Sequence, residues 1–164
     1  MRILVIAILL LSAQSCQNKT EMQSTNQNQI KMENSAEKAS IENVLNSYGD
    51  ALNTADVSKV LQIYTQDGVF MPTTLPTATG TEQLKESYSN IFKTIRLNVK
   101  FNIEEVLVNG DVAFARTSSK GNVIINATDQ SIPEENREFF LLKRKMENGK
   151  YPDICLTNLN RLYN

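Results

Sequence analysis

Three side chains of this sequence could carry chemistry inside a folded domain: Tyr48, Arg116 and Glu138. A tyrosine hydroxyl can donate a hydrogen bond to a developing oxyanion, a carboxylate can take up a proton, and a guanidinium can hold an anion. The chain has no histidine, so it lacks the usual proton shuttle at neutral pH and the commonest metal ligand. We therefore expect no metal site and no cofactor.

The sequence gives little indication of a nucleophilic cysteine or serine. Cys155 lies in an apolar stretch, where a small buried side chain is a better interpretation than a reactive thiol. Ser118 and Ser119 have no partner base that the sequence identifies. The formal net charge is −1 and no basic block stands out, so nucleic acid is not an expected partner.

Helices are expected at the start of the folded part. Apolar residues recur at helical spacing over residues 37–53 and place Tyr48 on the buried face. Asp56 is a good N-cap for a short second helix, and the apolar stripe of that helix ends at Tyr64.

A short strand over residues 69–71 and a loop over residues 72–80 are expected next. The loop holds two prolines and one glycine, which restrict and turn the backbone. A third helix follows, because Thr79 and Glu82 have the spacing of a capping box. Its apolar face includes Tyr88.

Strands follow the third helix, because the apolar period changes to two residues. Residues 97–103 alternate between apolar and polar types, and the alternation slips at Glu104-Glu105, which predicts a β-bulge. Asn109-Gly110 predicts a type I′ hairpin turn. The return strand is expected over residues 112–125.

The last part of the chain predicts two further strands. Residues 127–136 predict a polar loop, residues 137–145 a central strand buried on both faces, and residues 154–162 a final strand. The order of elements favours an α+β domain over residues 37–164. About three N-terminal helices would pack on a curved, mainly antiparallel sheet.

This order resembles the NTF2-like superfamily, and within it the SnoaL-like domains. The resemblance rests on four short motifs: residues 64–69 closing the second helix, Gly80 before the third, residues 109–113 at the hairpin, and Gly149-Lys150-Tyr151 before the last strand. It implies a cone-shaped, cystatin-like fold whose sheet wraps around the first helix, with an apolar pocket at the wide end. Members include enzymes, binding domains and dimerising modules, so the fold does not give the function.

The catalytic arrangements of the family are incomplete in this chain. The resemblance implies a steroid-isomerase arrangement with a tyrosine on the first helix, and Tyr48 matches that position. The general base of this arrangement would fall at Met71-Pro72 and its second acid at residues 140–142. None of these residues is an acid. The epoxide-hydrolase arrangement needs Arg-x-Asp, and residues 116–118 lack the aspartate. The dehydratase arrangement needs histidine.

Several pocket candidates remain, and each has a structural alternative. They are Tyr48, Tyr64, Met71, Thr73, Tyr88, Arg116 and Glu138. The tyrosines can pack in the core instead, and Arg116 either binds an anionic ligand or pairs with Glu138 across the sheet, with the pair favoured. We expect a domain that binds a small apolar or amphipathic ligand or a partner. An enzyme with an unrecognised constellation and a dimerising module (a homodimer) are the alternatives.

The first residues predict export. Residues 1–15 contain one charged residue, Arg2, then nine apolar residues, and then small and polar residues, which are the parts of a signal peptide. Nine apolar residues are too few to span a membrane. Ala13, Ser15 and Cys16 resemble the lipobox of bacterial lipoproteins, so Cys16 is the expected lipid anchor in the cell envelope. Ordinary cleavage to a soluble exported protein is the alternative. The polar segment over residues 16–36 predicts a flexible tether.

Overall fold

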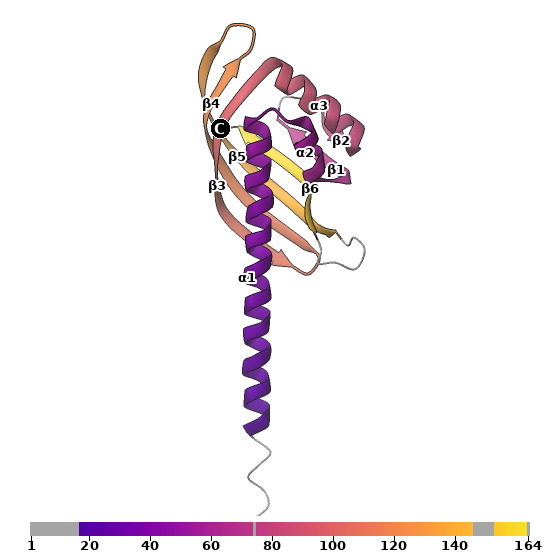
Figure 1. The fold of residues 1–164 in the computed structure, drawn as a ribbon, viewed down its shortest axis with the longest axis vertical. Coiled ribbons are helices and arrows are strands. Elements are labelled where there is room, and N and C mark those ends of the chain that lie inside the picture. The colour runs from indigo at the N-terminus through magenta and orange to yellow at the C-terminus, as the bar shows by residue number, and fades with distance from the viewer. Residues whose placement is uncertain (1–16, 74, 146–152, 164) are drawn as a thin grey trace, which may run out of the picture. The chain divides into compact units, whose positions relative to one another are not determined.

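The computed structural model of the chain describes residues 17–73, 75–145 and 153–163, with side chains described for residues 35–73 and 75–144 (Figure 1). Two units divide the chain, residues 1–36 and residues 37–164, and the sheet belongs to the second. The expected signal peptide, Cys16, and the motif Gly149-Lys150-Tyr151 lie outside the described residues.

Helix α1 spans Gln17–Asn53, so it begins 20 residues before the predicted start at residue 37. The expected flexible tether is helical from Gln17 onwards. Its polar composition suggested disorder, but no glycine or proline interrupts residues 17–48, so nothing in this stretch breaks a helix. The predicted apolar stripe is confirmed: Ile41, Leu45 and Tyr48 are fully buried.

Helices α2 (Val57–Ile63) and α3 (Gly80–Thr94) occur where the sequence predicts them. The Asp56 carboxylate caps α2 by accepting a hydrogen bond from the Lys59 backbone N–H at 3.0 Å. The capping box predicted for α3 is wrong, because the Thr79 side chain makes no capping bond. The Gln83 side chain instead accepts a hydrogen bond from the Thr79 backbone N–H at 2.9 Å.

The sheet has six strands in the order β2-β1-β6-β5-β4-β3. Their bounds are Tyr64–Pro72 (β1), Ala78–Thr79 (β2), Ile95–Asn109 (β3), Val112–Ile125 (β4), Gln130–Lys145 (β5) and Asp153–Tyr163 (β6). The β1–β6 pair is parallel and the other pairs are antiparallel, which confirms the predicted α+β class. The helices of this unit lie over the inner face of the curved sheet (Figure 1).

Two strands begin at least five residues earlier than predicted. β1 begins directly at Tyr64, and β5 begins at Gln130 within the expected polar loop. Residues 130–135 of β5 pair with β4, and the pairing of β5 with β6 begins at Asn136. Pro133 therefore lies where β5 has an open side, and proline is tolerated at such an edge.

The predicted β-bulge is confirmed by a shift of register in the β3–β4 ladder between Ile103 and Glu105. The hairpin at Asn109-Gly110 is also confirmed, but its turn differs from the prediction. Gly110 has a φ of 60°, whereas Asp111 does not have a positive φ. A type I′ turn needs a positive φ at both positions, so the turn has the type II′ pattern.

No helix among the described residues is long and apolar enough to cross a membrane.

Candidate functional site

Three buried tyrosines from separate elements meet in the core. Tyr48 comes from α1, Tyr64 from the start of β1 and Tyr88 from α3, and their exposed fractions are 0%, 6% and 1%. The Tyr88 hydroxyl lies 2.9 Å from the Tyr48 hydroxyl and 2.9 Å from the Tyr64 hydroxyl. We call these three residues the tyrosine trio. Each was a pocket candidate, and the structure brings all three together.

The central hydroxyl of the trio is held in its neutral form. Burial raises the pKa of Tyr88 well above its ordinary value of 10.0, and the charges that Tyr48 and Tyr64 would carry raise it further. A neutral phenol keeps its proton at physiological pH and can donate a hydrogen bond.

Aromatic rings hold the trio in place. The Tyr48 ring meets Phe101 and Phe140 edge to face, with ring centres 5.9 Å and 5.7 Å away. The Tyr88 ring stacks on Phe70 at 4.8 Å. Such edge-to-face and stacked pairs stabilise a defined ring orientation.

A second group of polar side chains lies on the inner face of the sheet. We call it the Glu138 cluster; it consists of Thr117, Ser119, Asn136 and Glu138, which are at most 2% exposed. The Thr117 hydroxyl donates to Glu138 Oε2 at 2.7 Å, and the Ser119 hydroxyl donates to Glu138 Oε1 at 2.5 Å. The Oδ1 atom of Asn136 is buried and has no hydrogen-bond partner among the residues the structure describes.

The trio and the cluster face the same interior. Phe140, which packs on Tyr48, lies two residues after Glu138 on β5, and side chains two apart on a strand share a face. Phe101, which also packs on Tyr48, is the Cα partner of Ser119 in the β3–β4 ladder. The arrangement therefore joins apolar rings, neutral hydroxyls and one carboxyl group.

Arg116 lies on the opposite face of the sheet, so the predicted pair with Glu138 is wrong. Its guanidinium binds Glu104 at 2.5 Å and Glu105 at 3.5 Å, and its side chain is 52% exposed. The physical reason is the alternation of the strand: the Cα partner of Glu138 is Thr117, and the preceding residue on β4 points to the other side.

The other two candidates lie at the end of β1. Met71 is partly buried near the end of β1, and Thr73 is exposed just after that strand.

Sequence reasoning missed three members of the Glu138 cluster. The sequence identifies no partner base for Ser119, whereas in the structure its hydroxyl donates to the Glu138 carboxyl group. Thr117 and Ser119 continue the alternation of Ala113 and Ala115, which are buried, and this parity is the signal that could have found them. Asn136 ends the predicted polar loop over residues 127–136, where no burial is expected.

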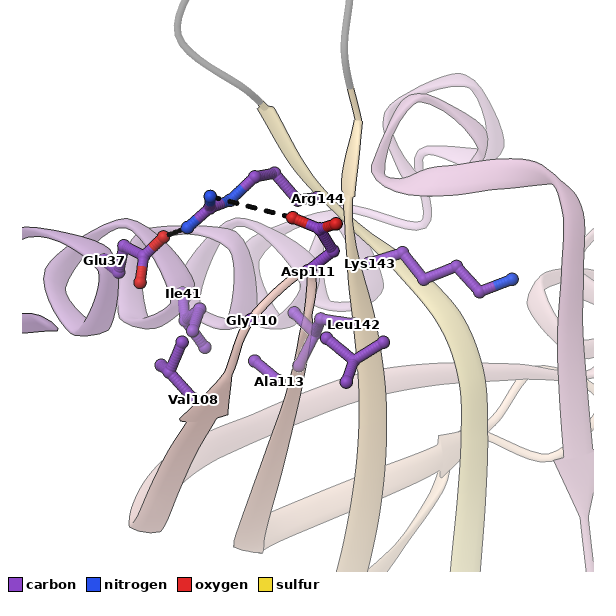
Figure 2. Close-up of a pocket in the computed structure, with 10 residues that line it drawn as sticks. Glu37, Ile41, Val108, Gly110, Asp111, Ala113, Leu142, Lys143 and Arg144 are labelled. Carbon is purple, nitrogen blue, oxygen red and sulfur yellow. Dashed lines mark ion pairs between the residues drawn. The ribbon is translucent and has the colours of Figure 1, made fainter.

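A shallow recess lies where α1 meets the β3–β4 hairpin and β5 (Figure 2). Arg144 crosses it, pairs with Glu37 and reaches Asp111 at 3.7 Å. The volume of the recess is about 10 Å³, which is about the space of one water molecule. The recess is therefore too small to hold a substrate. The described residues also contain no group of three or more cysteine, aspartate or glutamate side chains that could hold a metal ion.

Comparison with known proteins agrees with this architecture. The family model described as SnoaL-like domain matches residues 45–150. No curated protein matches the chain. A ketosteroid isomerase-like protein from Erwinia carotovora atroseptica is 31% identical, with a TM-score of 0.69, over 75% of this chain and 92% of that one.

Two more distant structures share the fold alone. An NTF2-like superfamily protein from Salmonella enterica serovar Typhimurium is 16% identical, covers 79% of this chain and 92% of its own, and has a TM-score of 0.69. A domain with a cystatin-like fold from Nostoc punctiforme is 13% identical, covers 79% and 78%, and has a TM-score of 0.62. The chain belongs to the SnoaL-like domain family.

Proposed function

We propose that this chain is a binding domain of the cell envelope that holds a small amphipathic ligand between the tyrosine trio and the Glu138 cluster. The observation that carries the proposal is the Oδ1 atom of Asn136, a buried acceptor without a described partner. Such an atom costs free energy unless a donor reaches it. It lies on the same strand face as the Glu138 carboxyl group, two residues away.

The chemistry of the cluster defines the ligand class. Asn136 Oδ1 accepts hydrogen bonds, and an ionised carboxylate is an acceptor as well. A ligand that fits these groups presents a hydroxyl or ammonium donor. The rings of Tyr48, Phe101 and Phe140 would contact its apolar part. An apolar interior with a few converging polar groups is typical of small-molecule sites.

Three observations support a non-catalytic role. Glu138 is 2% exposed and each of its oxygens accepts one hydroxyl hydrogen bond, so the carboxyl group is held in place while each oxygen keeps a lone pair for a ligand. Tyr88 uses its hydroxyl to bridge two other tyrosines. Arg116, the cation that could have completed a charged constellation, lies on the other face. A general acid or base must reach the reacting atom, and these contacts favour binding over turnover.

Native mass spectrometry of the protein purified from its own cells tests the proposal. We expect a retained small molecule in wild-type protein and its loss in Asn136→Leu, which replaces the amide by an apolar side chain of similar size and so removes the acceptor. Asn122→Leu is the matched control, because that asparagine is exposed on β4. Equal retention in both variants, or no retained mass in wild type, would contradict the proposal.

The proposal includes the location in the cell envelope that the first residues predict. A lipid anchor on Cys16 would hold the domain in the cell envelope, and several acyl chains on one residue suffice for stable attachment. Cys16→Ser should release the protein from the membrane fraction. Cys155→Ser is the control, since it changes a thiol outside the predicted lipobox. Unchanged membrane association of Cys16→Ser would contradict the anchor without touching the ligand proposal.

A second candidate function is an isomerase, and one specific observation favours it. The relative that is 31% identical is named ketosteroid isomerase-like, and Tyr48 shares the interior with a carboxyl group. The assay would follow conversion of a β,γ-unsaturated steroid ketone to its conjugated isomer. If the chain is an isomerase, Tyr48→Phe should lower kcat about 100-fold through loss of an oxyanion donor. Absence of turnover in wild type would exclude this candidate for that substrate class.

A further inference from the structure

A further carboxyl group lies on the inner face of β5, next to the Glu138 cluster. Glu134 precedes Asn136 by two residues, and side chains two apart on a strand share a face. The Cα partner of Glu134 on β4 is Gly121, and the partner of Gly121 on β3 is the buried Val99. This register places Glu134 on the inner side of the sheet.

Neither described neighbour of β5 places a side chain directly across from Glu134. On one side stands Gly121, which must be glycine because the β3 backbone at Asn98 lies where a Cβ atom would be. On the other side the pairing of β5 with β6 begins only at Asn136. Solvent reaches this end of β5, since Glu134 is partly exposed and Ile132, on the same face, is 39% exposed. A ligand can therefore approach Glu134 from this end of the strand.

The negative charge of Glu134 is not balanced by any side chain that the structure describes. The adjacent Glu135 lies on the outer face and pairs with Lys120 at 2.8 Å. Within residues 35–73 and 75–144, no lysine or arginine forms an ion pair with Glu134. A carboxylate that is partly withdrawn from water attracts a cation more strongly than a fully exposed one.

Asn136 supplies an independent observation. It is 1% exposed, and its Oδ1 atom has no hydrogen-bond partner among the described residues. Residues two apart on a strand are separated by roughly 7 Å, so one small group can lie between the Asn136 amide and the Glu134 carboxylate. An ammonium group has several N–H donors and a positive charge, so it can donate to both. A hydroxyl group has a single donor and no charge, so it can use only one of them fully.

We infer that the ligand of the inner face is an amphipathic amine, whose ammonium group is bound by Glu134 and Asn136 together. The inference rests on the proposed function and adds the charge of the ligand and the residue that selects it. Phe101 and Asn136 lie in one row of the sheet, because each is a Cα partner of Ser119. The apolar part of the amine therefore lies against Phe101 and the Tyr48 ring that packs on it. An anionic ligand of the same shape is disfavoured, because Glu134 repels it.

Isothermal titration calorimetry of the full chain with matched probes tests the inference. Phenethylammonium, phenethyl alcohol and phenylacetate share a phenyl ring and differ in charge. Wild type should bind the ammonium probe at least about tenfold more tightly than the alcohol, and phenylacetate more weakly than either. Glu134→Gln should weaken binding of the ammonium probe about tenfold and leave the alcohol unchanged, because only the charge is lost. Glu135→Gln is the matched control and should change neither, since Glu135 is exposed on the outer face.

The outcomes distinguish this inference from the proposed function. A preference for the ammonium probe that Glu134→Gln abolishes and Glu135→Gln keeps supports the inference. Equal binding of the ammonium and alcohol probes, with both weakened by Asn136→Leu, overturns it and leaves the proposed function standing. A preference that survives Glu134→Gln also overturns it. Absence of binding by every probe, or unchanged binding in Asn136→Leu, overturns both. Far-UV circular dichroism of each variant shows whether the fold is kept.

Discussion

The Tyr88 hydroxyl lies 2.9 Å from the Tyr48 hydroxyl, although 40 residues separate them and each belongs to a different helix. This contact fixes α3 against α1 over the inner face of the sheet. The third hydroxyl, from Tyr64, reaches Tyr88 at the same distance and ties in the start of β1. Tyr88 is therefore the central residue of the trio.

Removing the Tyr88 hydroxyl should destabilise the domain. Tyr88→Phe keeps the ring stacked on Phe70 but takes one hydrogen-bond partner from each of the other two hydroxyls. We expect a loss of about 2 kcal/mol in the free energy of unfolding, measured by urea titration. Tyr64→Phe, which breaks the Tyr64–Tyr88 contact and leaves the Tyr48–Tyr88 contact in place, should cost less. An equal or smaller loss in Tyr88→Phe would contradict the bridging role.

The raised pKa of Tyr88 predicts a decrease in stability at high pH. The folded protein keeps the Tyr88 proton above the ordinary pKa of 10.0, while the unfolded chain releases it. The contribution is fully present below pH 10 and is lost as pH rises towards the folded pKa, by at most about 1.4 kcal/mol per pH unit. Urea titrations between pH 9 and pH 11, roughly one unit on either side, should show a shallower decline in Tyr88→Phe than in wild type. Identical slopes would contradict the assignment.

The turn after α1 should be stabilised by glycine. Ala55 has a φ of 51°, in the left-handed region where a Cβ atom is unfavourable, and Asp56 N–H closes the helix end on Ala51 at 3.0 Å. Ala55→Gly should raise the free energy of unfolding by about 0.5–1 kcal/mol. Ala39→Gly, at an exposed position inside α1, should lower it by about 1 kcal/mol. A change of the same sign in both variants would contradict the backbone argument.

Asp67 should titrate below the ordinary range of an aspartate. A hydrogen bond from the Thr65 side chain lowers its pKa most, a backbone hydrogen bond comes next, and the Lys143 charge adds to these. Its stabilising contribution is therefore present above the ordinary pKa of 3.8 and is lost as pH falls below it. Carboxyl NMR of Asp67 should show a larger upward shift of the pKa in Thr65→Val than in Lys143→Met. The reverse order would contradict the role of Thr65.

Much of the fold could be predicted from residue patterns. The slip of alternation at Glu104-Glu105 gave the β-bulge, and the stripe of α1 placed Tyr48 in the core. These features depend on neighbouring residues. The start of α1 and the start of β5 at Gln130 were missed, because polar composition does not distinguish a loop from a solvated helix. It also does not distinguish a loop from the end of a strand that pairs on one side only.

The sequence predicted which residues of the site are buried, but not which of them meet. Each tyrosine of the trio could be found on an apolar stripe, but their meeting depends on how α1, β1 and α3 pack. The pairing of Arg116 with Glu138 failed because it depends on register between strands, and a difference of one residue moves a side chain to the other face. Sequence periodicity gives the parity within a strand and leaves the register across strands open.

The central claim is that the Glu138 cluster binds a ligand, and exchanging its carboxyl group for an amide tests this most directly. Glu138→Gln keeps the size of the side chain and replaces one acceptor oxygen by a donor. Glu135→Gln is the matched control, since Glu135 is exposed on the same strand and pairs with Lys120. Native mass spectrometry of the three proteins, purified from their own cells, should show a retained ligand in wild type and Glu135→Gln and little in Glu138→Gln. Equal retention in all three, or none in wild type, would contradict the account.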